Sequence, residues 1–341
     1  MNILITGANG YIANMLCELF AADEAVTTIT AIDMQDSHKA EIIARDPHKI
    51  SWITQNLADD GWQEQALAHG TPDVIIHCAF VIREQYGKRR QWQIRSNVTA
   101  AQNIFSFAFT HHIPKLIYFS TVASYGALPA NSPDHFFTED DPFRKSRYSY
   151  AEDKRVIEEN LHTLYDQACK AGSFTPQIFI IRPASVTGPR GQGSFKKLGL
   201  LSMIKQSFPF MPLTDWRSAR QYVHEDDIAN AVLMLTRNAV PGKYEVFNLS
   251  PKGYLLLRDI AKMMNKKVIK IPVWFGKMGF WFAWHITRGK FPTPPESIDS
   301  FSYPINVDGS KITRFGFHYR YTCTEAFLAQ KGRFVKNNHE Q

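Results

Sequence analysis

Short, almost uninterrupted apolar runs recur along the first half of the chain, and most are followed by a longer stretch with helical periodicity. Successive side chains of a strand point to opposite faces, so a run that is apolar at every position predicts a strand covered on both faces. Such strands alternating with helices predict an α/β fold, a Rossmann-type doubly wound parallel sheet. The predicted strands are Ile3–Thr6, Thr28–Ile32, Ile50–Thr54, Asp73–His77, Leu116–Ser120 and Gln177–Ile181, and the predicted helices are Tyr11–Ala22, Trp92–Thr110 and Tyr148–Ala171.

A glycine-containing segment follows the first predicted strand and opens the first predicted helix. Gly7 permits a sharp turn out of the strand, and Gly10 has no side chain that could block a pyrophosphate. Ala13 is small enough for the helix to pack close to the sheet. A helix N-terminus offers free N–H groups and a partial positive charge. The GxxGxxA spacing in this position predicts a dinucleotide-binding loop.

Asp33 stands at the end of the second predicted strand. A carboxylate in this place can accept hydrogen bonds from both hydroxyls of an adenosine ribose and repels a 2′-phosphate, which favours NAD over NADP. Lys39 and Arg45 follow a few residues later and keep NADP open as an alternative.

The composition of the sequence changes after Arg182: glycine and proline become frequent, and aromatic residues cluster. We interpret this part as a smaller C-terminal substrate-binding domain. One helix, Asp227–Thr236, and one strand, Tyr244–Leu249, are expected to return to the first domain. The predicted division is an NAD-binding Rossmann domain over 1–182 with 218–250 returning to it, a substrate-binding domain over 183–217 and 251–330, and a polar tail over 331–341.

Composition sets wider bounds. A chain of 341 residues suggests about two domains at roughly 150 residues each. Its 39 Lys and Arg against 32 Asp and Glu give a net charge of +7, which fits an anionic small molecule as well as nucleic acid. No nucleic-acid module is recognisable, so we predict no nucleic-acid partner. The four cysteines, Cys17, Cys78, Cys169 and Cys323, form no CxxC pair, which favours a reducing cytoplasm without disulfides or a structural zinc site.

The most apolar segment is Val273–Ile286. A bilayer span needs roughly 20 apolar residues, and this segment is shorter and contains Lys277, so no stable membrane insertion is expected. We predict a buried or half-buried helix, with a membrane-surface contact or an apolar substrate wall as alternatives. No targeting segment is recognisable at the start of the chain.

A serine and threonine at the end of the fifth predicted strand, and a Tyr-x-x-x-Lys pair on a helix, form the candidate catalytic group. Tyr150 and Lys154 share a helix face, and a nearby ammonium favours the phenolate of a tyrosine, whose pKa is otherwise about 10. Tyr150 could then take a proton from a substrate hydroxyl while the carbon gives hydride to NAD⁺. The hydroxyl of Thr121 would hold the substrate oxygen. Tyr148 is expected to face elsewhere.

In order along the chain, these motifs resemble the extended short-chain dehydrogenase/reductase family, the NAD-dependent epimerase/dehydratase group. The resemblance covers about residues 1–250. It rests on TGANGYIA (6–13), Asp33, HCA (77–79), RSNV around Asn97, STVASYG (120–126), YAEDK (150–154), RPASVTGPR (182–190), RQYVHEDD (220–227) and FNLS (247–250).

The resemblance implies an enzyme with Thr121, Tyr150 and Lys154 as catalytic residues and Asn97 near the nicotinamide. It implies a homodimer paired through the helices near 92–110 and 148–171. Asn56 stands where the family usually has Asp, a mild departure. The implied NAD contacts are Gly7, Asn9, Gly10, Tyr11, Ile12, Asp33, Asn56, Leu57, Cys78, Ala79, Phe80, Tyr150, Lys154 and Pro183, and the implied substrate contacts are Thr121, Ser185 and Arg220.

Positions that differ from the family pattern reduce the number of reactions to consider. Sugar 4,6-dehydratases of the family usually carry an Asp-Glu pair directly after the threonine, and Val122 and Ala123 stand there, so dehydration is rejected. Arg220 matches an arginine that clamps a substrate diphosphate, whereas Ser185 replaces an asparagine of nucleotide-sugar epimerases. The first hypothesis is an NAD-dependent epimerase acting on a nucleotide sugar through a transient ketone. The alternatives are a dehydrogenase or reductase of an apolar or small substrate, similar to hydroxysteroid dehydrogenases, and a non-catalytic NAD sensor.

Two charged clusters have plainer interpretations. His224 and the three carboxylates that follow it look metal-like, but we expect the carboxylates to cap and charge the start of a helix, and predict no metal site. The basic residues Arg83, Lys88, Arg89, Arg90 and Arg95 indicate a solvated face, with a contact to substrate or to a partner as the alternative.

Overall fold

The computed structural model describes residues 1–36, 47–191, 209–238, 240–291, 293–329 and 331–334. Lys39 and Arg45, the two residues that kept NADP open, lie outside the described residues. So do residues 192–208 of the predicted substrate-binding domain and residues 335–341 of the predicted tail.

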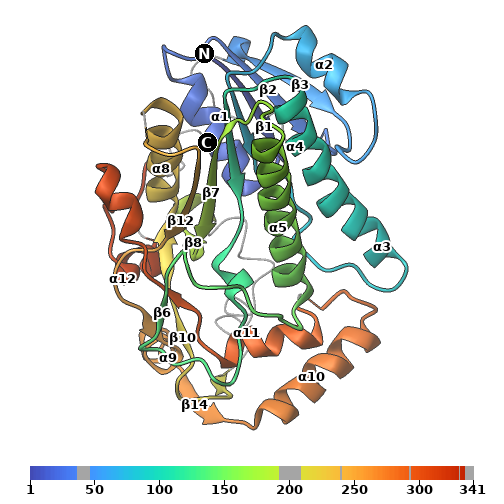
Figure 1. Cartoon of the computed structure of the whole chain (residues 1–341). Coiled ribbons are helices and arrows are strands. Elements are labelled where there is room, and N and C mark those ends of the chain that lie inside the picture. Colours follow the sequence, from blue (N-terminus) through green and yellow to red (C-terminus); the bar gives the residue numbers. More distant parts are fainter. Residues whose placement is uncertain (37–46, 192–208, 239, 292, 330, 335–341) are drawn as a thin grey trace, which may run out of the picture.

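A seven-stranded sheet in which all strands run parallel forms the centre of the molecule, in the order β12-β7-β5-β4-β1-β2-β3 (Figure 1). The chain moves outward from β1 through β2 to β3 and then returns to place β4 on the other side of β1. This reversal leaves a crevice at the carboxyl ends of the strands. The strands are β1 Asn2–Thr6, β2 Thr28–Asp33, β3 Ile50–Thr54, β4 Val74–His77, β5 Lys115–Phe119, β7 Gln177–Pro183 and β12 Tyr244–Leu249.

Helices cover both faces of this sheet, and two buried clusters show which helix covers which face. On one face, α1 and α8 pack against the sheet through side chains such as Leu16 and Val232. On the other face lie α2, α4 and α5, with Trp62, Ile104 and Leu161 among their buried side chains. The predicted doubly wound parallel sheet is confirmed. The helices that cover the sheet are α1 Tyr11–Ala21, α2 Trp62–Ala68, α4 Ala100–Thr110, α5 Ser149–Lys170 and α8 Glu225–Arg237. A further helix, α3 Arg89–Ile94, precedes α4.

The helix predicted over Trp92–Thr110 begins earlier, at Arg89, and is not regular. A π-helical turn over Arg95–Thr99 joins α3 to α4, and Asn97 lies within this turn. Single π turns inside helices are frequent at functional sites because they redirect a side chain.

Shorter elements gather at the carboxyl edge of the sheet, below it in Figure 1. Pairs of short strands connect distant segments there: β8 with β11, β9 with β14, β10 with β13 and β6 with β15. The division into two domains at the predicted residues stays a prediction. The strands are β6 Phe136–Phe137, β8 Ser185–Thr187, β9 Phe210–Leu213, β10 Ala219–Arg220, β11 Tyr222–His224, β13 Leu255–Leu256, β14 Lys267–Lys270 and β15 Asn306–Val307, and the helices are α9 Leu257–Met263, α10 Val273–Ile286, α11 Ile298–Ser302 and α12 Cys323–Leu328.

A buried ion pair fixes α5 to β7. The guanidinium of Arg182 donates to Glu158 Oε1 through Nε at 2.9 Å and through Nη2 at 2.5 Å, and both side chains are almost fully buried. Arg182 also donates to the hydroxyl of Tyr125 at 2.5 Å. Because Glu158 lies one helical turn beyond Lys154, this pair sets the position of the helix that carries the Tyr-x-x-x-Lys residues.

We expect Glu158→Gln to destabilise the fold by about 3–5 kcal/mol, since the substitution leaves the buried guanidinium of Arg182 without a counter-charge. The matched control is Glu159→Gln, which removes a carboxylate from the surface pair with Arg155 and should cost under about 1 kcal/mol. Urea unfolding measures both free energies. Equal losses for the two variants would contradict the role given to the buried pair.

Candidate active site

One cavity of about 900 Å³ opens at the carboxyl ends of the central strands. Its walls come from the turns that follow β1, β2, β4, β5 and β7, from the start of α5, and from the C-terminal part of the chain. The predicted site residues that line it are Gly7, Asn9, Gly10, Tyr11, Ile12, Asp33, Asn56, Leu57, Cys78, Ala79, Phe80, Thr121, Tyr150, Lys154, Pro183, Ser185 and Arg220.

The glycine turn after β1 is built so tightly that its glycines cannot be replaced without strain. Gly7 has φ of 70°, and a Cβ on it would lie 2.7 Å from Ala79 Cα, at the end of β4. A Cβ on Gly10 would lie 2.9 Å from the carbonyl oxygen of Gly7. Helix α1 starts after Gly10 without a side-chain cap, so its first N–H groups stay free to bind an anion.

Asp33 closes the neighbouring wall. Its carboxylate accepts hydrogen bonds from the backbone N–H of Asn9 at 3.0 Å and of Gln35 at 2.9 Å. These bonds hold the carboxylate at the rim of the glycine turn while leaving acceptor capacity on both oxygens. Asn56 is fixed in a similar way, since its side chain accepts from the N–H of Ala58 at 3.0 Å and donates to Ser96 Oγ at 3.2 Å.

A buried histidine joins the ends of β1 and β4. His77 Nδ1 and the hydroxyl of Thr6 are 2.7 Å apart, and burial lowers the pKa of His77 to about 3, so the imidazole is neutral. Burial also raises the pKa of the neighbouring Cys78 thiol far above its usual range. Neither side chain is charged near neutral pH, so this wall of the cavity is apolar in character.

Tyr150 and Thr121 meet at the centre of the cavity. The Thr121 hydroxyl hydrogen-bonds the phenol and lowers its pKa, but burial outweighs this effect and raises the pKa of Tyr150 above its ordinary value. The expected acidification by Lys154 is not among the causes of this shift. Burial of the phenol dominates this shift, and acidification by Lys154 together with a positive nicotinamide stays a prediction.

Lys154 lies against the same wall. Its ammonium donates to the carbonyl of Phe119 and sits over the ring of Phe80 at 4.3 Å and that of Tyr118 at 4.9 Å. Burial lowers its pKa to about 7. The amine can therefore lose and regain a proton near neutral pH, which suits a proton-relay role beside Tyr150.

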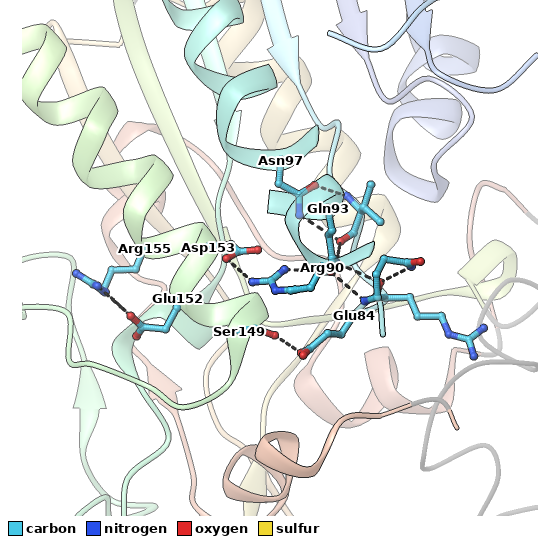
Figure 2. A network of polar contacts seen from close by, with 11 residues as sticks. Glu84, Arg90, Gln93, Asn97, Ser149, Glu152, Asp153 and Arg155 are labelled. Carbon is cyan, nitrogen blue, oxygen red and sulfur yellow. Dashed lines mark hydrogen bonds and ion pairs between the residues drawn. The ribbon is translucent and has the colours of Figure 1, made fainter. Parts of the chain in front are cut away.

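Asn97, expected near the nicotinamide, does not line the cavity. Its side chain accepts from the N–H of Val81 at 2.7 Å and donates to the carbonyl of Val81 at 3.3 Å, from the π-helical turn (Figure 2). Gln93, one helical turn earlier, donates to the same carbonyl at 2.7 Å. The two amides clamp the segment after β4, whose residues Phe80 and Val81 line the cavity, so Asn97 acts on the site through this segment.

The same network reaches the start of α5 (Figure 2). Arg90 donates to Asp153 at 2.6 Å and to Gln93 at 3.0 Å, and Glu84 accepts from the hydroxyl of Ser149, next to Tyr150. The interpretation of the basic cluster as a solvated face was therefore wrong for Arg90, which joins α3 to α5.

Tyr148 was expected to face elsewhere, and the structure corrects this. Tyr148 precedes the first turn of α5 in extended conformation, so it escapes the helical periodicity on which the expectation rested. Its ring lies 5.7 Å from that of Tyr150, and it lines the same cavity.

Arg220 and Ser185 face the cavity from the C-terminal side. Arg220 donates to the carbonyl of Ser300 at 2.6 Å, and its guanidinium lies 4.9 Å from the centre of the Phe301 ring. Burial lowers its pKa, and within the described part of the chain no carboxylate forms an ion pair with it. A largely desolvated guanidinium with free N–H groups is suited to an anionic ligand.

Some residues of the cavity carried no sequence signal. Ser297, Ser300, Phe301 and Tyr303 reach it from α11 and its flanks, where the sequence shows no recognisable motif. The strand that follows α11, β15, pairs with the distant β6, and a pairing of this kind is not visible in a local sequence pattern.

Glu225 is a second residue whose place could not be read from the sequence. It was expected to help cap α8, but His224 is the cap, accepting from the N–H of Asp226 at 3.1 Å. The buried Glu225 instead accepts from the hydroxyl of Tyr11 and from the N–H groups of Arg190 and Gly191, both at 3.1 Å. In the described ranges, no cluster of His, Cys, Asp and Glu could hold a metal.

The described residues fit a pyridine dinucleotide. The glycine turn leaves room for a pyrophosphate, the α1 N-terminus offers free amides, and Asp33 offers acceptors for ribose hydroxyls. Two buried polar atoms of cavity-lining residues, Asn9 Oδ1 and Ser120 Oγ, have no hydrogen-bond partner in the described structure. A bound polar ligand would satisfy such groups.

Comparison with known proteins agrees with this geometry. The profile of the NAD dependent epimerase/dehydratase family matches residues 3–250, so the chain belongs to this enzyme family. It is 26% identical over 337 residues to the N-acetyl-α-D-glucosaminyl-diphospho-ditrans,octacis-undecaprenol 4-epimerase of Escherichia coli O157:H7, covering 95% of this chain and 92% of that protein.

Two solved structures share the fold. One is the UDP-glucose 4-epimerase of Thermotoga maritima in complex with UDP-glucose, with a TM-score of 0.70, 19% identity and coverage of 96% of this chain and 97% of that one. The other is the Bordetella bronchiseptica enzyme WbmG in complex with NAD and UDP, with a TM-score of 0.68, 20% identity and coverage of 96% and 92%.

We expect Gly7→Ala to abolish NAD binding, because its Cβ would push the turn away from Ala79. The matched control is Gly87→Ala, which also has positive φ, of 60°, but has open space around the added atom. The control should lose about 1–2 kcal/mol of stability and keep NAD affinity. Calorimetric titration with NAD measures the binding. Undiminished affinity in Gly7→Ala would refute the role of the glycine turn in binding the cofactor.

Proposed function

We propose that the chain is an NAD-dependent epimerase that inverts a hydroxyl-bearing carbon of a sugar carried on a diphosphate, with a nucleotide sugar as the first candidate substrate. One observation carries this proposal: Tyr150, Thr121 and Lys154 line the same cavity as the glycine turn after β1 and Arg220. Family membership and the 4-epimerase relatives support it.

The chain's own groups divide the work. Thr121 orients the substrate hydroxyl, and Tyr150 takes its proton as the adjacent carbon becomes a ketone. Lys154 assists the proton transfer, since its pKa of about 7 lets the amine lose and regain a proton near neutral pH. When bound, oxidised NAD supplies the hydride acceptor and a positive charge that favours the phenolate. The cavity would let the ketone turn, the bound cofactor would supply the hydride back to its opposite face, and Tyr150 would return the proton, so that no net oxidation occurs.

The position of Arg220 supports a diphosphate-bearing substrate. It lies on the C-terminal wall, and bidentate hydrogen bonds from a guanidinium suit phosphate oxygens. A nucleoside diphosphate and a polyprenyl diphosphate both present this group. The relative from Escherichia coli O157:H7 is named for a sugar on undecaprenyl diphosphate, so both carriers are candidate substrates here.

A second candidate is a net dehydrogenase or reductase of an apolar substrate. It is favoured by the apolar side chains on the substrate side of the cavity, among them Val122, Phe301, Ile305 and Phe327. Steady NADH formation with an alcohol, and no isomer from any sugar diphosphate, would decide for this candidate.

Three further properties belong to the proposal. NAD is favoured over NADP because Asp33 faces the cavity at the ribose position. A homodimer is proposed through α4 and α5, which run side by side at the surface (Figure 1). A cytoplasmic location is proposed because Cys17, Cys78, Cys169 and Cys323 are all free thiols.

Tyr150→Phe should lower kcat by about 10²–10⁴ and leave NAD affinity unchanged, because it removes only the proton acceptor. The matched control, Tyr148→Phe, removes a phenol hydroxyl from the same cavity and should change kcat less than about tenfold. Isomer formation from UDP-linked and polyprenyl-diphosphate-linked sugars, followed by chromatography, measures both. A Tyr150→Phe enzyme that retains near-normal kcat would overturn the assignment of the base.

Arg220→Ala should raise KM for a sugar diphosphate by about ten- to a hundredfold, since one charged hydrogen-bonding partner of the diphosphate is lost. Arg217→Ala is the control, because Arg217 is exposed and paired with Asp215 at 2.7 Å. An unchanged KM in Arg220→Ala would point away from a diphosphate at this wall and toward the second candidate.

A further inference from the structure

Helix α10 presents an apolar face to solvent that nothing in the described structure covers. The side chain of Trp274 is 66% exposed and that of Ile286 is 77% exposed. Monomeric soluble proteins rarely expose a contiguous apolar patch of this kind without a binding role. We define the α10 face by its exposed large side chains, Trp274, Phe275, Met278, Trp281, Phe282 and Ile286.

The opposite side of α10 is firmly packed, so the exposed face has a fixed orientation. Gly276 approaches Ile298 of α11 so closely that a Cβ would lie 3.1 Å from its side chain. Phe280 packs edge-to-face against Phe301, with ring centres 6.2 Å apart, and Trp284 is buried. We predicted a buried or half-buried helix for this segment, and α10 is half-buried, with only this side packed against the protein.

The surroundings of the α10 face are strongly basic. Residues 260–295 contain six Lys and one Arg and neither Asp nor Glu, a charge equal to the net +7 of the whole chain. Lys267 and Lys270 are exposed on β14, just before α10, and Arg288 and Lys290 are exposed just after it. Positive charge therefore flanks the apolar face at both of its ends.

A neighbouring segment extends this surface. Tyr86 contacts Trp284 and His285 of α10, with ring centres 6.1 and 5.8 Å apart. Arg83 donates to the carbonyls of Gly289 and Lys290 and is itself exposed. The exposed Ile82 lies on this segment, so apolar and basic side chains stand together here as well.

We propose that the α10 face docks the protein on an anionic lipid surface, lying in the headgroup region without crossing the membrane. Tryptophan favours this region because its ring buries apolar area while its N–H stays near water, and phenylalanine adds further apolar area. Each Lys or Arg near an anionic leaflet adds attraction, and one apolar anchor alone gives only reversible binding. No helix of the described residues is long and apolar enough to cross a bilayer.

Charge and composition favour lipid over a second copy of the chain. Two copies meeting through this face would bring the same basic flanks together without carboxylates from residues 260–295 to oppose them. The acidic groups nearest to α10 in sequence, Glu296 and Asp299, are half-buried, and Asp299 already interacts with Lys277 of the same protein.

Docking in this way would hold the cavity close to the membrane. Phe280 of α10 touches Phe301, and Phe301 lines the cavity beside Arg220. The packed side of α10 thus contacts a residue that lines the cavity. Figure 1 shows the same order, with α11 between α10 and the carboxyl edge of the sheet.

The test is flotation of the full-length protein with two kinds of vesicle, one of phosphatidylcholine alone and one of equal parts phosphatidylcholine and phosphatidylglycerol. Wild-type protein should float with the mixed vesicles and show a blue shift of tryptophan emission from Trp274 and Trp281. Neither substrate nor turnover is needed, so failure of this proposal and failure of the proposed epimerase activity are told apart.

Matched variants locate the binding surface. Phe282→Ser, on the α10 face, should weaken binding to the mixed vesicles by about tenfold. Phe174→Ser removes another exposed phenylalanine, 36% exposed against 50% for Phe282, beyond the far end of α5 and should leave binding unchanged. Lys267→Glu combined with Lys290→Glu should weaken binding to the mixed vesicles by about tenfold or more, since it reverses two charges. Melting curves and NAD titration check that each variant is folded.

Three results would overturn the proposal. The first is wild-type protein that stays out of the mixed vesicles, and the second is an equal effect of Phe282→Ser and Phe174→Ser. The third is a wild-type dimer in sedimentation that dissociates in Phe282→Ser while no vesicle binding is seen, which would show that a second copy covers the face. If Phe282→Ser fails to fold, the double charge variant decides, because unchanged binding to the mixed vesicles would refute the role of the basic flanks.

Discussion

The parallel direction of all seven central strands is the constraint on which the site depends. Because the strands share one direction, their carboxyl ends meet at one edge, and the turns that leave them become neighbours. Gly7 after β1, Asp33 at the end of β2, Cys78 after β4 and Thr121 after β5 are far apart in sequence and line one cavity for this reason. The close approach of Gly7 to Ala79 marks how tightly two of these turns fit.

A second layer of contacts sets the catalytic helix against this edge. The buried pair of Arg182 and Glu158 fixes α5 to β7, and the network around Gln93 and Arg90 fixes its start to the segment after β4. The reactive side chains are held by lighter contacts: Tyr150 hydrogen-bonds Thr121, and Lys154 donates to the carbonyl of Phe119 without an ion pair to a carboxylate among the described residues. Precision at the site therefore comes from residues one layer away, which leaves the reactive groups free to bind ligands.

The sequence allowed the sheet and the cofactor side of the cavity to be predicted, because their signals are local. An apolar run such as Ile50–Thr54 or a turn such as Gly7–Gly10 is determined by adjacent residues. The failures arose where long-range packing decides. Tyr148 precedes α5 in extended conformation, outside the helical periodicity, and the side chain of Asn97 bonds the backbone of Val81 instead of lining the cavity. The contribution of α11 to the cavity carried no motif at all.

The bond between Glu225 and Tyr11 bears on how a bound dinucleotide would leave the cavity. This one carboxylate links the first turn of α1, on the cofactor side of the cavity, to the backbone of Arg190 and Gly191 on the facing wall. Moving these two walls apart would break the bonds to the Glu225 carboxylate, which is fully buried. In the proposed epimerase, the hydride returns to the molecule that gave it, so bonds that hold the cleft closed would let one bound cofactor serve many turnovers.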